Sequence, residues 1–122
     1  MPTTSLCPPN AILFVFDPTN TEVVVPAYVD RELVASNETC VSVGTQPDVD
    51  GPTEVSLTVG GGTSNDLVRV FSGAIKTPGG RIAIVTSDFQ RVLELTVPIG
   101  SVEVSIWSDD DRSPARITVN VT

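Results

Sequence analysis

Residues 81–107 read RIAIVTSDFQRVLELTVPIGSVEVSIW, and this stretch decides the fold. Residues 87–88 (SD) and 98–100 (PIG) are turn-forming and divide it into three runs. In each run apolar side chains occupy alternate positions, a period typical of β-strands with one face on a core. These side chains are Ile82 and Ile84, then Leu93, Leu95 and Val97, then Val102, Val104 and Ile106. We therefore predict three neighbouring strands of an antiparallel meander.

The rest of the chain continues this pattern. Further strands are predicted at residues 11–16, 21–25, 39–44, 53–59, 66–75 and 115–121. Residues 28–36 hold the only stretch suited to a helical turn, and the three prolines of residues 1–10 predict an extended arm. The expected fold is all-β: an antiparallel β-sandwich or jelly roll of eight or nine strands, with at most one short helix. Residues 11–122 then form a single sandwich domain.

The composition narrows the classes of partner. The 122 residues include 15 acidic and 7 basic side chains, for a net charge of −8. Such a charge repels the phosphate backbone of DNA or RNA and attracts basic surfaces. No apolar stretch is long enough to cross a membrane, and the N-terminus lacks the pattern of a secretory signal. We expect a cytoplasmic protein that binds neither nucleic acid nor membranes; its oligomeric state stays open.

The residues available for chemistry argue against catalysis. The chain has no histidine, which removes the commonest general base and the usual metal ligand. Lys76 is the one lysine, and it stands in a Pro-Gly turn. We therefore predict no enzymatic activity, no catalytic residues and no cofactor. Cys7 and Cys40 permit either one disulfide or two free thiols, although the apolar run around Cys40 favours a small core residue.

The densest charge cluster is the run formed by Asp109, Asp110 and Asp111. Aspartates on a loop at the end of a sandwich supply oxygen ligands for calcium, so these three are the candidate metal ligands. Their spacing differs from that of an EF-hand loop, and Arg112 partly neutralises them, so no metal site is predicted. Two other interpretations are an acidic patch that docks on a basic cleft and a solvated hairpin loop. Sequence leaves open whether residues 48 and 50 lie at the same end.

Trp107 ends the third run of the opening stretch, directly before this acidic loop. Alternation places it on the face of Glu103 and Ser105, opposite Val104 and Ile106. A tryptophan on an outer face beside acidic residues suits an interface anchor, but it also suits a gap at the end of the core. The predicted partner-binding residues are Trp107, Asp109, Asp110 and Asp111.

Four segments of the second half resemble the small bacterial β-sandwich proteins related to competence protein J, a family of nuclease inhibitors. These segments are residues 81–86, LELTVPIG at 93–100, the strand at 101–107 and the final strand at 115–121. The match departs from the family after the glycine of the V-P-x-G turn, where an aromatic residue often follows and this chain has Ser101 and Val102. The resemblance implies an inhibitor or immunity-type protein that binds a partner and performs no chemistry.

Three functional hypotheses follow. The first is an acidic inhibitor that neutralises a basic protein partner, such as a nuclease or a toxin, since an acidic protein fits a basic cleft. The second is a calcium- or carbohydrate-binding jelly roll. The third is a structural or capsid-type jelly roll.

Overall fold

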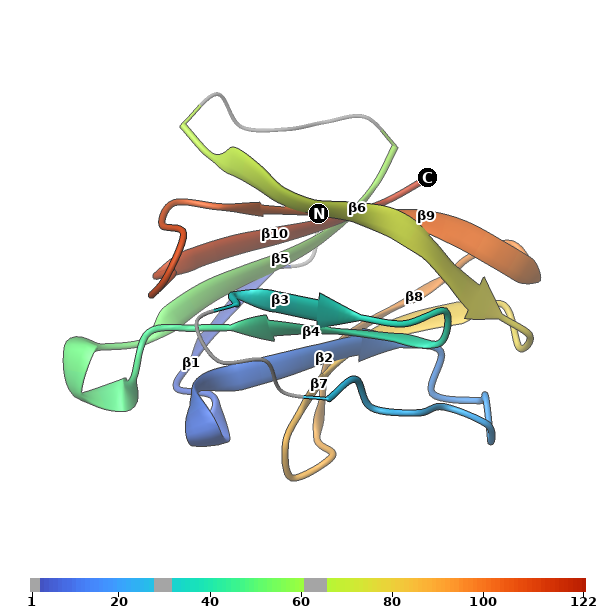
Figure 1. The fold of residues 1–122 in the computed structure, drawn as a ribbon, viewed down its shortest axis with the longest axis horizontal. Helices are drawn as coiled ribbons and strands as arrows, with labels where there is room; N and C mark the ends of the chain where they lie inside the picture. The colour runs from blue at the N-terminus through green and yellow to red at the C-terminus, as the bar shows by residue number, and fades with distance from the viewer. Residues whose placement is uncertain (1–2, 28–31, 61–65) are drawn as a thin grey trace.

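The computed structural model describes residues 3–27, 32–60 and 66–122 and confirms the predicted all-β sandwich (Figure 1). In the described part, ten strands form two five-stranded sheets, one strand more than the upper expectation. The helical elements described are two three-residue 3-10 turns, η1 (Pro9–Ala11) and η2 (Asp48–Asp50). None of the described helices has the length or apolar character needed to span a membrane.

The first sheet has the strand order β1-β5-β10-β9-β6. Its strands are β1 (Thr3–Leu6), β5 (Thr53–Val59), β10 (Arg116–Val121), β9 (Gly100–Ser108) and β6 (Val68–Thr77). Three of its four pairings are antiparallel, but β5 and β10 run parallel, with Val55 opposite Ile117. A parallel pair needs a long crossover connection, and these two strands are separated by β6 to β9 along the chain.

The second sheet has the strand order β3-β4-β2-β7-β8 and is antiparallel throughout. Its strands are β3 (Val34–Ser36), β4 (Cys40–Gly44), β2 (Ile12–Phe16), β7 (Arg81–Thr86) and β8 (Arg91–Thr96). Alternate aliphatic side chains of both sheets meet between the layers, where Leu13, Leu57, Ile82 and Ile106 are fully buried. Each such side chain stabilises the fold by about 1.5–3 kcal/mol relative to an exposed position.

The predicted three-stranded meander is wrong in one respect. β7 and β8 form the expected hairpin, with Ile82 opposite Leu95, but β9 lies in the other sheet between β10 and β6. The chain crosses between the layers after β8, where Val97 donates a 2.8 Å backbone hydrogen bond to Gly80 and Gly100 adopts a φ of 121°. Alternation of apolar residues indicates that a strand has one buried face. It does not indicate which of the two sheets the strand joins, because each sheet has one face on the core.

Three expectations at the N-terminal half need correction. Part of the expected extended arm, Thr3–Leu6, is β1, and it pairs with β5. Residues 21–25 form no strand, because side chains capture the backbone of Val24: its N–H donates to Thr39 Oγ1 (3.0 Å), and its carbonyl accepts from Asn37 Nδ2 (2.8 Å). The expected helical turn at 28–36 falls partly outside the described residues, and its last three residues are β3.

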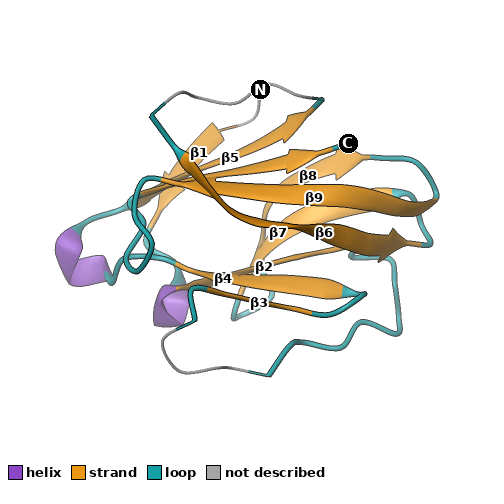
Figure 2. Ribbon diagram, turned by 45° about the horizontal axis from the view of Figure 1, so that its top comes forward, coloured by secondary structure: helices purple, strands orange, loops and turns teal. Residues whose placement is uncertain are grey.

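Four connections gather at one end of the sandwich, which we call the loop end (Figure 2). These are η1, η2, the turn between β7 and β8, and the loop between β9 and β10. Asn10 Nδ2 donates to Ser87 Oγ (3.0 Å), and Ser87 Oγ donates to the carbonyl of Pro9 (3.2 Å), which joins η1 to the β7–β8 turn. The backbone N–H of Gln46 donates to Pro114 (2.9 Å), which joins the η2 segment to the β9–β10 loop.

Candidate functional site

The acidic run lies in the β9–β10 loop, and two of its carboxylates hold that loop in shape. Asp109 Oδ1 accepts hydrogen bonds from the backbone N–H groups of Ala115 (3.0 Å) and Arg116 (3.1 Å). Asp110 Oδ1 accepts from the backbone N–H groups of Arg112 (2.7 Å) and Ser113 (2.9 Å). Aspartate commonly satisfies free backbone donors in turns in this way. Two of the three aspartates therefore stabilise the conformation of the hairpin loop.

The electrostatics of Asp110 agree with this role. The backbone N–H groups of Ser113 and Arg112 stabilise its ionised form and lower the pKa of its carboxyl. Asp111 differs from its two neighbours, because its exposed carboxylate has no hydrogen bond or ion pair within the described residues. Asp111 is the member of the run whose charge is free to meet a partner.

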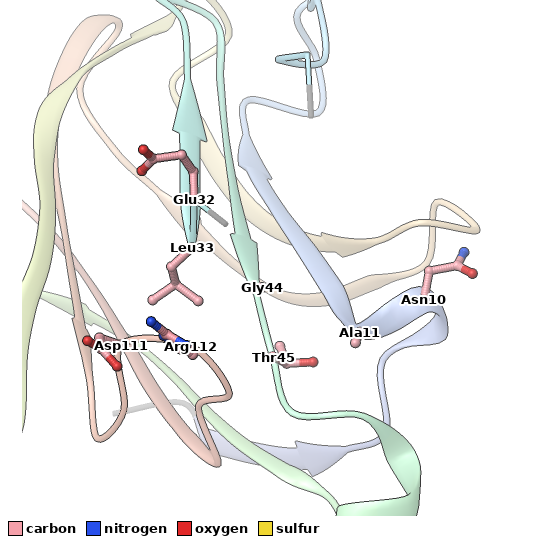
Figure 3. Close-up of a pocket in the computed structure, with 8 residues that line it drawn as sticks. All are labelled: Asn10, Ala11, Glu32, Leu33, Gly44, Thr45, Asp111 and Arg112. Atoms are coloured by element: carbon pink, nitrogen blue, oxygen red, sulfur yellow. The ribbon is translucent and has the colours of Figure 1, made fainter. Parts of the chain in front are cut away.

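Two hollows flank this loop and share Asp111. One, of about 320 Å³, lies between the loop and the β3–β4 edge of the second sheet (Figure 3). Leu33 points into it toward Asp111 and Arg112, whereas the carboxylate of Glu32 points away from the loop. The other, of about 380 Å³, is lined by the loop and by Val68 and Val70 of β6. Both hollows are shallow and have a mixture of apolar and charged walls.

Trp107 lies on the outer face of the first sheet, as alternation predicts. It stands between Thr118 of β10 and Arg69 of β6 in the strand register. Its ring is half-buried, and its indole N–H is buried with no hydrogen-bond partner among the described residues. Trp107 lines neither hollow beside the loop. The structure therefore does not bring Trp107 and the three aspartates into one pocket.

Further carboxylates join the run at the loop end. Asp48 and Asp50 belong to η2, so they lie at the same end as Asp111, a question that sequence left open. Asp88 stands in the β7–β8 turn, where its carboxylate accepts from Thr86 Oγ1. Asp88 could not be predicted as part of this surface, because a Ser-Asp pair in the sequence indicates only a turn.

The arrangement of these groups does not suit a bound metal ion. In the described ranges, no three aspartate, glutamate or cysteine side chains are grouped closely enough to hold one. Asp109 and Asp110 direct one oxygen each at their own backbone, and a calcium site instead needs several oxygens that converge on one point. Nothing in this geometry favours the calcium-binding alternative.

Comparisons with known proteins identify a shared fold. No family model matches the sequence, and no curated protein matches it. Among solved structures, the crystal structure of ComJ from Bacillus subtilis superposes with a TM-score of 0.73 over 99% of this chain and 94% of that chain. The chain has the fold of ComJ. This finding confirms, for the fold, the resemblance expected from the sequence.

ComJ is described as the inhibitor of the DNA-degrading activity of NucA. The two sequences are 15% identical, so the likeness to ComJ concerns the course of the backbone rather than particular side chains.

The two cysteines are both free, which settles the alternative left open by the sequence. Cys7 is exposed in the connection between β1 and η1, whereas Cys40 is buried at the start of β4. Burial raises the pKa of the Cys40 thiol to about 12. Cys40 is thus an inert core residue, as its apolar surroundings predicted.

Proposed function

We propose that this protein is a non-enzymatic inhibitor that neutralises a basic protein partner, such as a nuclease or a toxin. The observation that carries the proposal is the fold shared with ComJ over nearly the whole of both chains. The net charge of −8 supports it, because nucleases must attract a polyanion and so present basic surfaces that an acidic protein can cover.

The proposed mechanism is electrostatic capture at the loop end. Asp111, together with Asp48 and Asp50 at the same end, gives this end a surplus of negative charge. Such a field steers a cationic partner into contact and raises the association rate at low ionic strength. Trp107 is proposed as an aromatic contact on the adjoining sheet face, where its half-buried ring is already held in place and offers contact area at low entropic cost.

The same proposal places the protein in the cytoplasm. Free thiols at Cys7 and Cys40 are compatible with a reducing compartment. The absence of histidine from the sequence supports a role in binding rather than in acid–base catalysis.

The experiment that tests the proposal is a nuclease assay with purified NucA and plasmid DNA. We expect the protein to stop DNA degradation near equimolar amounts, and the association rate to fall steeply between about 50 and 500 mM salt. A charge-reversal variant that carries Asp48→Lys, Asp50→Lys and Asp111→Lys should lose most of this salt dependence, because these exposed carboxylates can be reversed without removing the acceptors that shape the β9–β10 loop. Undiminished degradation at a tenfold excess of the protein would contradict a NucA-like nuclease as the target.

A further inference from the structure

Two large apolar side chains stand in solvent at the loop end. Val49, in the middle of η2, is 86% exposed, and Phe89, in the β7–β8 turn, is 73% exposed. Single exposed apolar residues are ordinary on protein surfaces, so exposure alone decides nothing. What distinguishes this pair is its position, because η2 and the β7–β8 turn, which carry these two side chains, lie on either side of η1.

The segment η1 connects the two tips into one surface. On one side, Pro9 and Asn10 share a shallow hollow of about 230 Å³ with Pro47 and Asp48, next to Val49. On the other side, Ser87 bonds to both Asn10 and Pro9, two residues before Phe89. Figure 1 shows η1 between η2 and the β7–β8 turn along the same side of the molecule. The segments that carry Val49, the exposed Pro9 and Phe89 therefore follow one another along this end, and we call these three side chains the apolar strip.

Folding alone gives no reason for a phenylalanine at position 89. Its backbone φ of 63° lies in the left-handed region, which glycine and asparagine adopt readily and a bulky residue does not. Its ring is too exposed to contribute much burial. The residue thus costs backbone strain without a packing benefit, and strain of this kind occurs where a side chain is held for contact with another molecule.

Carboxylates border the apolar strip at both tips. Val49 stands between Asp48 and Asp50, and Asp88 directly precedes Phe89. Apolar anchors surrounded by charged groups are the common plan of a protein-binding surface, in which the rim selects the partner and the anchors supply affinity. A negative rim selects a partner whose apolar recess is bordered by lysine and arginine.

We propose that the apolar strip is the contact surface for the basic protein partner, with Phe89 and Val49 as its anchors. The inference rests on the proposed function and goes further, because it locates the main affinity in η2 and the β7–β8 turn. Lysine and arginine side chains of the partner then meet Asp48, Asp50 and Asp88. On this surface the β9–β10 loop contributes charge at the border rather than the anchors.

The first test measures the affinity for NucA of the wild type, Phe89→Asn, Val49→Ala and the matched control Ile99→Ala. Ile99 is 78% exposed at the opposite end of the sandwich, between β8 and β9. Phe89→Asn suits the left-handed backbone, so it should keep or raise the melting temperature while it weakens binding roughly tenfold or more. Val49→Ala should weaken binding in the same direction, and Ile99→Ala should leave it unchanged. Equal affinities for all four proteins would overturn the strip, while inhibition by the wild type would leave the proposed function standing.

A second test decides the case in which NucA does not bind at all, a result that contradicts the nuclease proposal. A photo-crosslinking benzoylphenylalanine at position 89 or 99 is exposed to an extract of the source organism, and adducts are identified by mass spectrometry. An adduct specific to position 89, with a protein of basic isoelectric point, and lost when Asp48, Asp50 and Asp88 become asparagine, supports the strip. The same adducts at both positions, no adduct, or a second copy of this acidic chain refutes it.

Discussion

The carboxylate of Asp17 accepts a 2.8 Å hydrogen bond from the backbone N–H of Gly79, 62 residues further along the chain. The same buried carboxylate accepts from the N–H and hydroxyl of Thr19 (2.8 and 2.7 Å), so it joins the turn after β2 to the turn between β6 and β7. A Cβ atom at position 79 would lie 1.6 Å from Thr19 Oγ1, so only glycine permits this approach. The contact therefore ties the two sheets together at the end opposite the loop end.

We predict that Asp17→Asn destabilises the fold by about 2–4 kcal/mol, because an amide cannot accept at both positions and leaves a backbone N–H unpaired. Urea denaturation of the variant and of the exposed control Asp48→Asn measures this difference. Asp48→Asn should stay within about 0.5 kcal/mol of the wild type.

The same variant has a pH signature. Burial alone raises the pKa of Asp17, but hydrogen bonds from Thr19, Gly79 and Arg81 outweigh it, and the pKa lies below its ordinary value. A lowered pKa stabilises the fold above the unfolded-state value of about 3.9, and that stability is lost as the pH falls through the folded-state pKa. The gap between the wild type and Asp17→Asn should thus narrow below about pH 4. A gap that stays constant down to pH 2 would contradict this account of Asp17.

A second prediction concerns the strained entry to β2. Ala11 has a φ of 53°, in the left-handed region, next to Asn10 with a φ of 59°. This conformation costs an alanine about 1–2 kcal/mol, whereas glycine adopts it freely. Ala11→Gly should therefore stabilise the protein, by about 0.5–1 kcal/mol after the greater flexibility of glycine in the unfolded chain is counted. Ala35→Gly in β3 is the control and should destabilise it; a loss of stability in both variants would show that Ala11 is not strained.

The acidic loop should separate stability from binding. Asp111→Asn removes a carboxylate that makes no hydrogen bond or ion pair within the described residues. The free energy of unfolding should therefore change by less than about 0.5 kcal/mol. Association with NucA should slow roughly two- to threefold at low salt, and the difference should vanish near 0.5 M salt.

Asp109→Ala removes the acceptor of two backbone N–H groups and should instead destabilise the fold by about 1 kcal/mol. Stopped-flow association and urea denaturation test the pair; the reverse assignment of effects would contradict it.

The sequence predicted local structure best where turn signals enclosed an alternating run. Residues 53–59 were predicted as a strand and form β5 with the same bounds, because Gly51 and a glycine run limit the pattern on both sides. Which strands pair with one another could not be predicted in the same way. Val102, Val104 and Ile106 alternate as expected, but nothing local shows that β9 leaves the sheet of β7 and β8. β1 was missed because its four residues carry one strong apolar side chain, Leu6.

The candidate site was predictable as a location but not in its parts. A run of three aspartates followed closely by a proline predicts a loop, and the structure has a loop there. Sequence cannot show that Asp109 and Asp110 satisfy backbone donors while Asp111 faces solvent, because that depends on the course of the loop. The position of Phe89 was visible in the sequence, yet an apolar residue within a Ser-Asp turn carries a functional signal only once its exposure is known.

A further prediction concerns the unpaired indole of Trp107. A buried N–H without a partner costs about 1–3 kcal/mol, and phenylalanine removes that donor while it keeps most of the apolar contact. Trp107→Phe should therefore retain the stability of the wild type or exceed it by up to about 1 kcal/mol. Trp107→Ala, which also loses the packing, should fall by about 1–2 kcal/mol. Circular dichroism is the suitable probe, since Trp107 is the one tryptophan. A large loss in Trp107→Phe would indicate that the indole N–H is bonded in solution.

The two thiols should differ sharply in reactivity. Cys7 is exposed, whereas Cys40 is buried in β4 between β3 and β2, with a pKa of about 12. At pH 8 such a pKa leaves on the order of one thiolate in ten thousand, so a disulfide reagent should modify one thiol per native chain and both after denaturation. In Cys7→Ser the native protein should not react, and in Cys40→Ala the native stoichiometry should stay at one. Equal rates at both thiols in the native wild type would mean that β3 opens from the edge of its sheet and exposes β4 on the timescale of labelling.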